Sequence, residues 1–236
     1  MARALTAPPG TVQVEVDLDT LAEAFARVFV ESFHARPGPR FVFVASGGPT
    51  ARRCYERLSE VGGTALDWSA VDVYMGDERC VPPDDPDANQ RLVREALLDR
   101  VPPVGSFHPM SCEDPDAYEQ EVRETAAFDV VHLGMGPDGH TASLFPDAPT
   151  LEAPPERLVV LSRDPHERNP HTRMSLTLPA LARARLVVFT VSGESKREAF
   201  AAVSSGEDLP AARVRAERVL WLVDRDAAGS ARGARR

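Results

Sequence analysis

The sequence predicts an α/β fold, a doubly wound and mostly parallel sheet flanked by helices. Short runs rich in Val, Leu and Phe, such as 41–45 and 186–191, have the length and composition of buried strands. Segments with helical spacing of apolar residues alternate with these runs. Neither a repeat nor a linker divides the chain. We therefore expect one domain over residues 1–226 and a disordered tail over residues 227–236.

The elements follow one another in a regular order. Residues 12–16 alternate like a half-exposed strand, and Asp17 or Asp19 is a candidate cap for the next helix. Glycine and proline mark most of the later boundaries, and residues 102–110 read as a connector. The predicted strands are 12–16, 41–45, 71–75, 128–133, 158–162, 173–178, 186–191 and 218–224. The predicted helices are 19–35, 51–61, 89–99, 114–126, 179–182 and 196–203.

Charge and composition exclude several classes of protein. The 236-residue chain has a formal net charge of −9 and no basic stripe, which argues against a nucleic-acid-binding protein. No stretch is long and apolar enough for a membrane span, and the N-terminal residues lack the apolar core of a secretory signal. We therefore expect a cytoplasmic protein without a membrane partner.

The cysteines and the clustered acidic and histidine residues match no metal motif. Cys54, Cys80 and Cys112 are an odd set without C-x-x-C spacing, so we expect neither a disulfide framework nor a zinc site, and Cys80 is expected to be a bystander. The acidic residues within 84–87 and the two histidines within 163–172 are expected to lie in solvated loops.

One stretch, residues 128–146 (FDVVHLGMGPDGHTASLFP), contains the strongest signal for a functional site. Its strand-like run leads into three glycines around Asp138, and His140 and Thr141 follow where a helix should begin. Such a turn presents backbone N–H groups to an anion, and a histidine is suited to proton transfer near neutral pH. A structural turn with a surface histidine is the alternative that the pattern leaves open.

Three further turns follow predicted strands, at 46–50 (SGGPT), 76–79 (GDER) and 192–196 (SGESK). In a parallel sheet these turns lie at the same edge, where ligands bind. The first turn suits a phosphate held by backbone amides and a hydroxyl group, but no Gly-Lys-Ser/Thr follows, so it is not a nucleotide-binding P-loop. Lys196 is the only lysine among the 27 basic residues, which hints at a need for a compact ammonium group there.

Together the turns predict an anion pocket. Arg79, Arg173 and Lys196 would converge with backbone amides on a phosphorylated metabolite, and His140 would transfer a proton. No G-x-S-x-G motif or Cys–His pairing is present, so a covalent acyl-enzyme is not expected. A Schiff base on Lys196, in an aldolase-like reaction, stays an open alternative.

Four blocks within residues 41–200 resemble the 6-phosphogluconolactonase family, in the family's order. They are VASGGPT, VYMGDERCVPPDDPDANQR, LGMGPDGHTASLFP, and RMSLTLPALARAR running into VVFTVSGESK. The third block is highly specific. The related glucosamine-6-phosphate deaminases have a DEY-type motif in place of GDER and an acidic residue after DGH, where this chain has SLFP. Both differences favour the lactonase.

The resemblance implies the Rossmann-like fold of these enzymes and hydrolysis of 6-phospho-D-glucono-1,5-lactone to 6-phosphogluconate in the oxidative pentose phosphate pathway. It makes His140 the base that activates water, with Asp138 and Asp77 nearby to orient or tune it. Arg79 or the amides of 134–139 are the implied oxyanion donors. The implied substrate contacts are Gly47, Gly48, Thr50, Gly136, Arg173 and Lys196. The resemblance implies no metal and no organic cofactor, and we expect a monomer or weak homo-oligomer.

The chain departs from the family pattern in three places. Pro49-Thr50-Ala51 stands where the family usually has Ser-Thr-Pro, Ala88 where it has Ser, and Ala182 where Asn is common. None of these changes removes a predicted catalytic group. Two other functions stay open, a deaminase or isomerase of the same fold and a non-catalytic sugar-phosphate-binding regulator.

Overall fold

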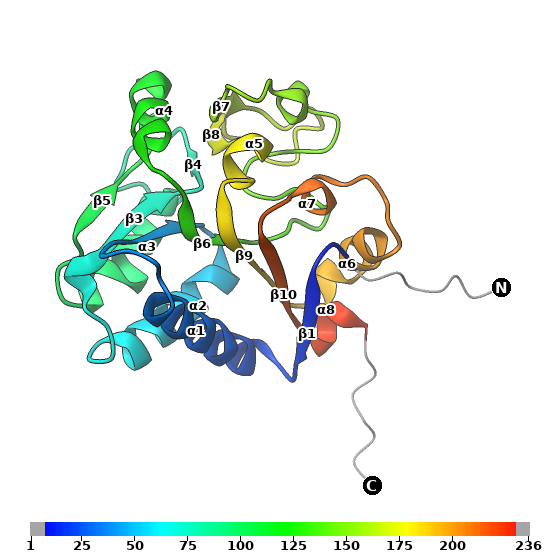
Figure 1. The fold of residues 1–236 in the computed structure, drawn as a ribbon. Helices are drawn as coiled ribbons and strands as arrows, with labels where there is room; N and C mark the ends of the chain where they lie inside the picture. The colour runs from blue at the N-terminus through cyan, green and yellow to red at the C-terminus, as the bar shows by residue number, and fades with distance from the viewer. Residues whose placement is uncertain (1–7, 230–236) are drawn as a thin grey trace, which may run out of the picture.

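A computed structural model describes residues 8–229 (Figure 1). Its main sheet has seven strands, and every neighbouring pair is parallel. The strand order is β1 (Thr11–Glu15), β10 (Arg218–Asp224), β9 (Ala184–Val191), β6 (Phe128–Leu133), β2 (Phe41–Ala45), β3 (Val71–Met75) and β5 (Ser106–His108). The predicted α/β class with a mostly parallel sheet is confirmed.

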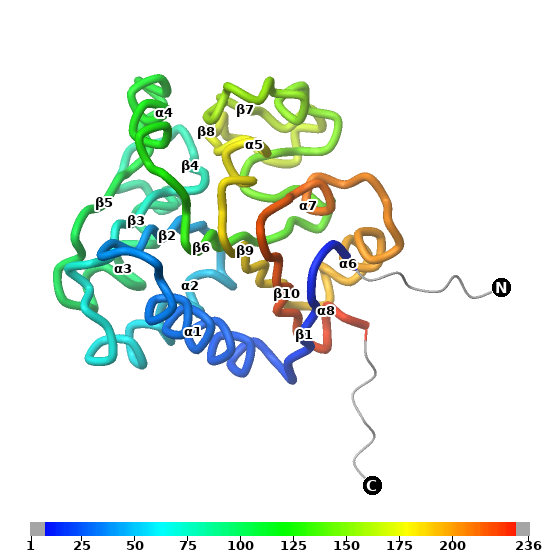
Figure 2. Tube along the Cα trace, in the orientation of Figure 1, coloured from blue at the N-terminus to red at the C-terminus, as the bar shows by residue number. Residues whose placement is uncertain are grey.

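The winding of the chain determines where a ligand site belongs. From β2 the chain adds β3 and β5 on one side, and β6 and β9 then extend the sheet on the other side of β2. The turns that leave β2 and β6 therefore diverge at a topological switch point, where open α/β sheets bind ligands. β1 pairs with β10, so the first and last strands of the described chain lie side by side (Figure 2).

A second, antiparallel sheet was not predicted. It contains β4 (Asp77–Arg79), β8 (Arg173–Leu176) and β7 (Val159–Ser162) in that order. The sequence places the triplet 77–79 in a turn after β3, but the chain leaves the main sheet at Gly76 and pairs with β8 instead. In this register Arg79 lies opposite Arg173.

Helices flank the main sheet; six follow the predicted order, and the short helices at 210–213 and 225–228 were not predicted. They are α1 (Leu18–His34), α2 (Pro49–Gly62), α3 (Asn89–Ala96), α4 (Pro115–Glu124), α5 (Leu178–Leu181), α6 (Arg197–Ser204), α7 (Pro210–Arg213) and α8 (Arg225–Ala228). Asp17 caps α1, since its carboxylate accepts the Thr20 N–H at 2.9 Å. Helices α1 and α2 lie together in Figure 1. The aromatic residues Phe25 and Phe29 of α1 are fully buried in the core.

Three local expectations are wrong. No helix begins at His140 and Thr141, because the chain reverses there and Thr141 forms an isolated bridge with Leu144. The connector 102–110 contains β5, whose three residues show no apolar pattern long enough to detect. Ala227 and Ala228 are not part of a disordered tail, since they belong to α8; residues 230–236 of the predicted tail lie outside the described residues.

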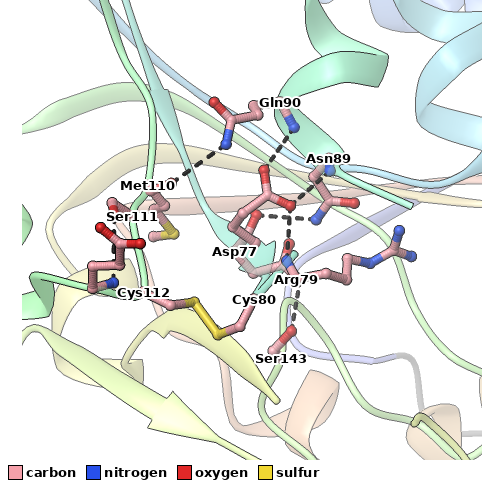
Figure 3. Close-up of a disulfide and its surroundings, with 11 residues drawn as sticks. Asp77, Arg79, Cys80, Asn89, Gln90, Met110, Ser111, Cys112 and Ser143 are labelled. Atoms are coloured by element: carbon pink, nitrogen blue, oxygen red, sulfur yellow. Dashed lines mark hydrogen bonds between the residues drawn. A yellow bond between two sulfur atoms is a disulfide. The ribbon is translucent and has the colours of Figure 1, made fainter. Parts of the chain in front are cut away.

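The cysteines also differ from expectation, because Cys80 and Cys112 form a disulfide (Figure 3). Cys80 follows β4, and Cys112 follows β5. Departure of β4 from the main sheet places the two Cα atoms 5.5 Å apart although the residues are 32 apart in sequence. That proximity is created by tertiary structure and leaves no spacing motif. Cys54 is free and buried.

Replacing Cys112 with serine is expected to lower the free energy of unfolding by about 3 kcal/mol, because a cross-link over this separation restricts the unfolded chain. Denaturant or thermal unfolding measures the effect. Dithiothreitol should destabilise the wild type by a similar amount and leave Cys112→Ser unaffected. The prediction would be contradicted if dithiothreitol left the unfolding midpoint of the wild type unchanged.

Candidate active site

A pocket of about 230 Å³ opens where the carboxyl ends of β2, β6 and β9 meet the second sheet. Nine of the ten predicted site residues line this pocket. The tenth, Asp138, does not line it but contacts His140, which does. The lining residues are Ser46, Gly47, Gly48, Pro49, Thr50, Ala51, Asp77, Arg79, Asn89, Gly134, Met135, Gly136, His140, Ala142, Asn169, Arg173, Thr190, Ser192 and Lys196.

His140 is held by Asp138. The distance from His140 Nδ1 to Asp138 Oδ1 is 2.6 Å, and Arg168 Nη2 lies 3.3 Å from the other carboxylate oxygen. Burial opposes ionisation of Asp138, but the hydrogen bond with His140 and the charges of His140 and Arg168 lower its pKa below the usual range. An ionised carboxylate accepts the Nδ1 proton, so Nε2 of a neutral ring is the free base.

The turn before His140 requires glycine at one position. A Cβ atom on Gly136 would lie 2.1 Å from His140 Nδ1, so any larger residue would displace the ring. The Gly136 N–H donates to the His140 carbonyl at 2.8 Å, and the Thr141 hydroxyl donates to the Gly134 carbonyl at 2.8 Å. His140 is thus positioned by a closed turn, in place of the predicted helix N-terminus.

The turn after β2 does lead into a helix. Gly48 has φ +99°, a conformation that favours glycine, and Pro49 is the first residue of α2. Gly48, Thr50 and Ala51 line the pocket at this helix N-terminus, where the first backbone N–H groups have no partner within the helix. Lys196 immediately precedes α6 and lines the pocket; its backbone N–H donates to the Gly193 carbonyl at 3.0 Å, while its ammonium group makes no hydrogen bond or ion pair within residues 8–229. Burial lowers the pKa of Lys196, although the charge of Asp138 opposes this shift.

A buried network supports the floor of this turn. The Ser46 N–H donates to Tyr55 Oη at 2.8 Å, and the Ser46 hydroxyl donates to the His132 carbonyl at 2.5 Å. The His132 ring contacts Tyr55 Oη at 2.9 Å and Thr190 Oγ1 at 2.8 Å. His132 is fully buried, and burial lowers its pKa to about 3.

The buried His132 should make the protein sensitive to acid. Its folded-state pKa of about 3 lies below the ordinary value of 6.5, so its contribution to stability is complete above pH 6.5 and is lost as the pH falls toward 3. The loss is about 1.4 kcal/mol per pH unit. Unfolding measured from pH 7 to pH 4 should show His132→Gln losing less stability than the wild type on acidification, and parallel curves would contradict this expectation.

The second sheet contributes the buried charges. Asp77 is 4% exposed; its Oδ2 accepts from the Ser143 hydroxyl at 2.7 Å and lies 3.9 Å from Arg173 Nη1. Burial lowers the pKa of Arg173, although the Asp77 charge raises it. Across the β4–β8 pair, Arg79 Nε and Arg173 Nε are buried and have no hydrogen-bond partner within residues 8–229. Two such donors beside one pocket suit an anion.

Glu78 holds β4 against α3. Its carboxylate accepts the backbone N–H groups of Arg79, Asn89 and Gln90, each at 2.7 Å. Ala88 at the N-cap position of α3 offers no side chain for this purpose. Glu78 therefore acts as a cap supplied by another element. Burial raises the pKa of Glu78 to about 7 while these three N–H groups oppose the shift.

Sequence reasoning missed some polar residues of the site. Asn169 and Thr190 line the pocket, and neither belongs to a turn or motif that the sequence singled out. Asn89 had a usable signal, because it lies in the same sequence block as GDER. The structure places it beside Asp77, to whose carbonyl its Nδ2 donates at 3.0 Å.

Residues 8–229 contain neither a candidate metal site nor a helix suited to span a membrane. Within 8–229 no group of three or more His, Cys, Asp or Glu side chains is placed to hold a metal ion. His166 and His171 contact different carboxylates, Asp147 and Asp87. No helix in this part of the chain combines the length and apolar character needed to cross a bilayer.

Known proteins resemble this chain over nearly its whole length. A family model described as glucosamine-6-phosphate isomerases/6-phosphogluconolactonase matches residues 16–221. The 6-phosphogluconolactonase of Mycobacterium tuberculosis is 37% identical over 242 residues, covering 92% of this chain and 97% of that protein. The Synechocystis 6-phosphogluconolactonase is 38% identical over 202 residues, covering 77% and 81%.

Solved structures agree with the sequence relatives. The 6-phosphogluconolactonase from Leishmania guyanensis superposes with a TM-score of 0.82 at 27% identity, covering 94% of this chain and 98% of that one. A monomeric glucosamine-6-phosphate deaminase has a TM-score of 0.78 at 20% identity over 93% and 99% of the two chains, which shows a common fold. This chain therefore belongs to the glucosamine-6-phosphate isomerase/6-phosphogluconolactonase family.

Proposed function

We propose that this protein hydrolyses 6-phospho-D-glucono-1,5-lactone to 6-phosphogluconate, the step of the oxidative pentose phosphate pathway that its curated relatives are named for. The observation that supports this most directly is the pairing of His140 with Asp138 at 2.6 Å beside a pocket with three cationic side chains. A base and a cation-lined pocket are what water attack on a phosphorylated lactone needs.

The proposed reaction begins with water held by His140. Nε2 of the neutral ring removes a proton from water as the oxygen attacks C1 of the lactone. The tetrahedral oxyanion is stabilised by Arg79 or by the amides of 134–139. Collapse breaks the bond between C1 and the ring oxygen, and His140 returns its proton to that oxygen as it leaves. The products are a carboxylic acid and the freed C5 hydroxyl group, so water and lactone are fully accounted for.

The phosphate is proposed to bind at the other end of the pocket. The N-terminus of α2 offers backbone N–H groups at Gly47, Gly48 and Thr50, and Lys196 and Arg173 add positive charge. Arg173 Nε has no other partner within the described chain, which supports its assignment to an anion. Asp77 offsets the charge of Arg173 and is held by Ser143.

The decisive experiment measures hydrolysis of freshly generated 6-phosphogluconolactone by the purified protein against the spontaneous rate. Fast, saturable acceleration is expected. Absence of acceleration would overturn the lactonase function, and ammonia release from glucosamine 6-phosphate would then support the deaminase alternative. That alternative is not favoured, because the deaminases have an acidic residue in the segment after DGH. In this chain the same segment brings the neutral Ser143 to Asp77.

Other expectations from the sequence stay predictions. They are the single domain over residues 1–226, the monomeric or weakly associating state, the absence of a nucleic-acid partner and the cytoplasmic location. Disulfides are rare in cytosolic proteins, so the Cys80–Cys112 bond makes the location worth measuring directly by fractionation.

A further inference from the structure

Asn89 has a hydrogen-bonding atom in the pocket that no role described above uses. It is the first residue of α3 and is 2% exposed. Its backbone N–H donates to Glu78 Oε1 at 2.7 Å. Its side-chain Nδ2 donates to the Asp77 carbonyl at 3.0 Å, and Figure 3 shows Asn89 beside Asp77. Both ends of the residue are therefore fixed, and its side chain has little freedom to turn.

These contacts decide which way the amide points. If the amide were rotated, Oδ1 would oppose the Asp77 carbonyl oxygen, and two acceptors would meet. Nδ2 therefore faces Asp77, and Oδ1 faces the turn after β2. A Cβ atom on Gly47 would lie 1.8 Å from Asn89 Oδ1, so glycine is required there to make room for this oxygen. Oδ1 is buried and has no hydrogen-bond partner within residues 8–229.

The chemistry of this atom differs from that of its neighbours. Arg79 Nε and Arg173 Nε are unpartnered donors, which phosphate or carboxylate oxygens can satisfy. An amide oxygen only accepts, so it repels those same anionic oxygens and needs a donor. In a phosphorylated aldonolactone the available donors are the hydroxyl groups at C2, C3 and C4.

We propose that Asn89 is a specificity residue whose Oδ1 accepts a hydrogen bond from one ring hydroxyl group of the lactone. This proposal rests on the proposed lactonase function. It predicts that the pocket discriminates against a substrate that lacks that hydroxyl group, because the buried oxygen then stays unpaired in the complex. The pocket would thereby select a polyhydroxy acid lactone from among other phosphate-bearing esters.

The test is a thermodynamic cycle that combines a change in the protein with the removal of one hydroxyl group from the substrate. Wild type and Asn89→Ala are assayed for kcat/KM with 6-phosphogluconolactone and its 2-deoxy, 3-deoxy and 4-deoxy analogues. The wild type should lose about 10-fold to 100-fold in kcat/KM with one analogue. Asn89→Ala should lose a similar factor with the full substrate and little more with that analogue. Discrimination of wild-type size by Asn89→Ala against all three analogues would overturn the proposal.

Two further variants separate the role of the Asn89 oxygen from a general loss of packing. Asn89→Asp retains the acceptor oxygen but sets its second oxygen against the Asp77 carbonyl, so its overall activity should fall while the discrimination is retained. Gln90→Ala removes the neighbouring buried amide, which does not line the pocket, and should leave the discrimination unchanged. If Asn89→Ala does not fold, wild-type discrimination of less than about threefold against every analogue overturns the proposal on its own.

Failure of the proposed function is separable from failure of this inference. A wild type that does not accelerate hydrolysis of 6-phosphogluconolactone refutes the lactonase. The same cycle is then measured by calorimetry as binding of 6-phosphogluconate and its deoxy analogues. Coupling between Asn89 and one hydroxyl group supports the inference in that readout as well, and additive losses refute it.

Discussion

His140→Ala is expected to lower kcat for 6-phosphogluconolactone by about 10²-fold to 10⁴-fold, the range typical of a general base. The variant should keep its affinity for 6-phosphogluconate, because the phosphate is proposed to bind at the opposite end of the pocket. The measurement is the rate of lactone hydrolysis at neutral pH, corrected for the spontaneous reaction, together with product binding by calorimetry.

Two variants provide controls for this result. His166→Ala removes an exposed histidine whose partner is Asp147, outside the pocket, and should leave kcat unchanged. Asp138→Asn should reduce kcat by a smaller factor than His140→Ala, because it leaves the base in place but removes the carboxylate that sets its tautomer. Turnover by His140→Ala within tenfold of the wild type would refute the assignment of His140 as the base.

Lys196→Ala is expected to raise KM by about 10-fold to 100-fold with a smaller effect on kcat, because it removes an ammonium group proposed to bind the phosphate. The side chain has no competing partner within the described residues, so its loss should not leave another buried charge unpaired. Steady-state kinetics and titration with inorganic phosphate measure the effect, and phosphate should inhibit the variant more weakly than the wild type.

The adjacent Arg197 gives a matched control. Its guanidinium group pairs with Glu194 at 2.9 Å and does not line the pocket, so Arg197→Ala should leave KM unchanged. Lys196→Arg should recover part of the affinity, because it restores the charge without the compact geometry. An unchanged KM in Lys196→Ala would remove this residue from the phosphate site.

The main sheet was predictable because its strands are short apolar runs whose signal is local. FVFVA and LVVFTV need both faces covered, and each is followed by a turn and a helix. The second sheet was not predictable in the same way. β4 is the charged triplet 77–79, which has no strand pattern of its own and becomes a strand only by pairing with β8, almost a hundred residues later.

The candidate site likewise has a part that local sequence predicts and a part that depends on tertiary structure. His140 and Asp138 are two residues apart, and the glycine-rich turns are recognisable from their composition. Both were therefore predicted from local sequence. The contact of Ser143 with Asp77 and the orientation of the Asn89 amide depend on tertiary packing. The expected helix at His140 was wrong because glycine and a polar residue also begin closed turns, and the sequence alone does not separate the two.

The unpaired polar atoms of Arg79, Arg173 and Asn89 imply a trade-off between stability and activity. Each buried atom without a partner destabilises the protein by about 1–3 kcal/mol relative to a satisfied or apolar replacement. The benefit of an apolar replacement is limited at Arg173, because its loss would leave the buried Asp77 carboxylate without a cation. Selection for stability alone would therefore act mainly against the unpaired Asn89 oxygen, which a bound ligand would satisfy.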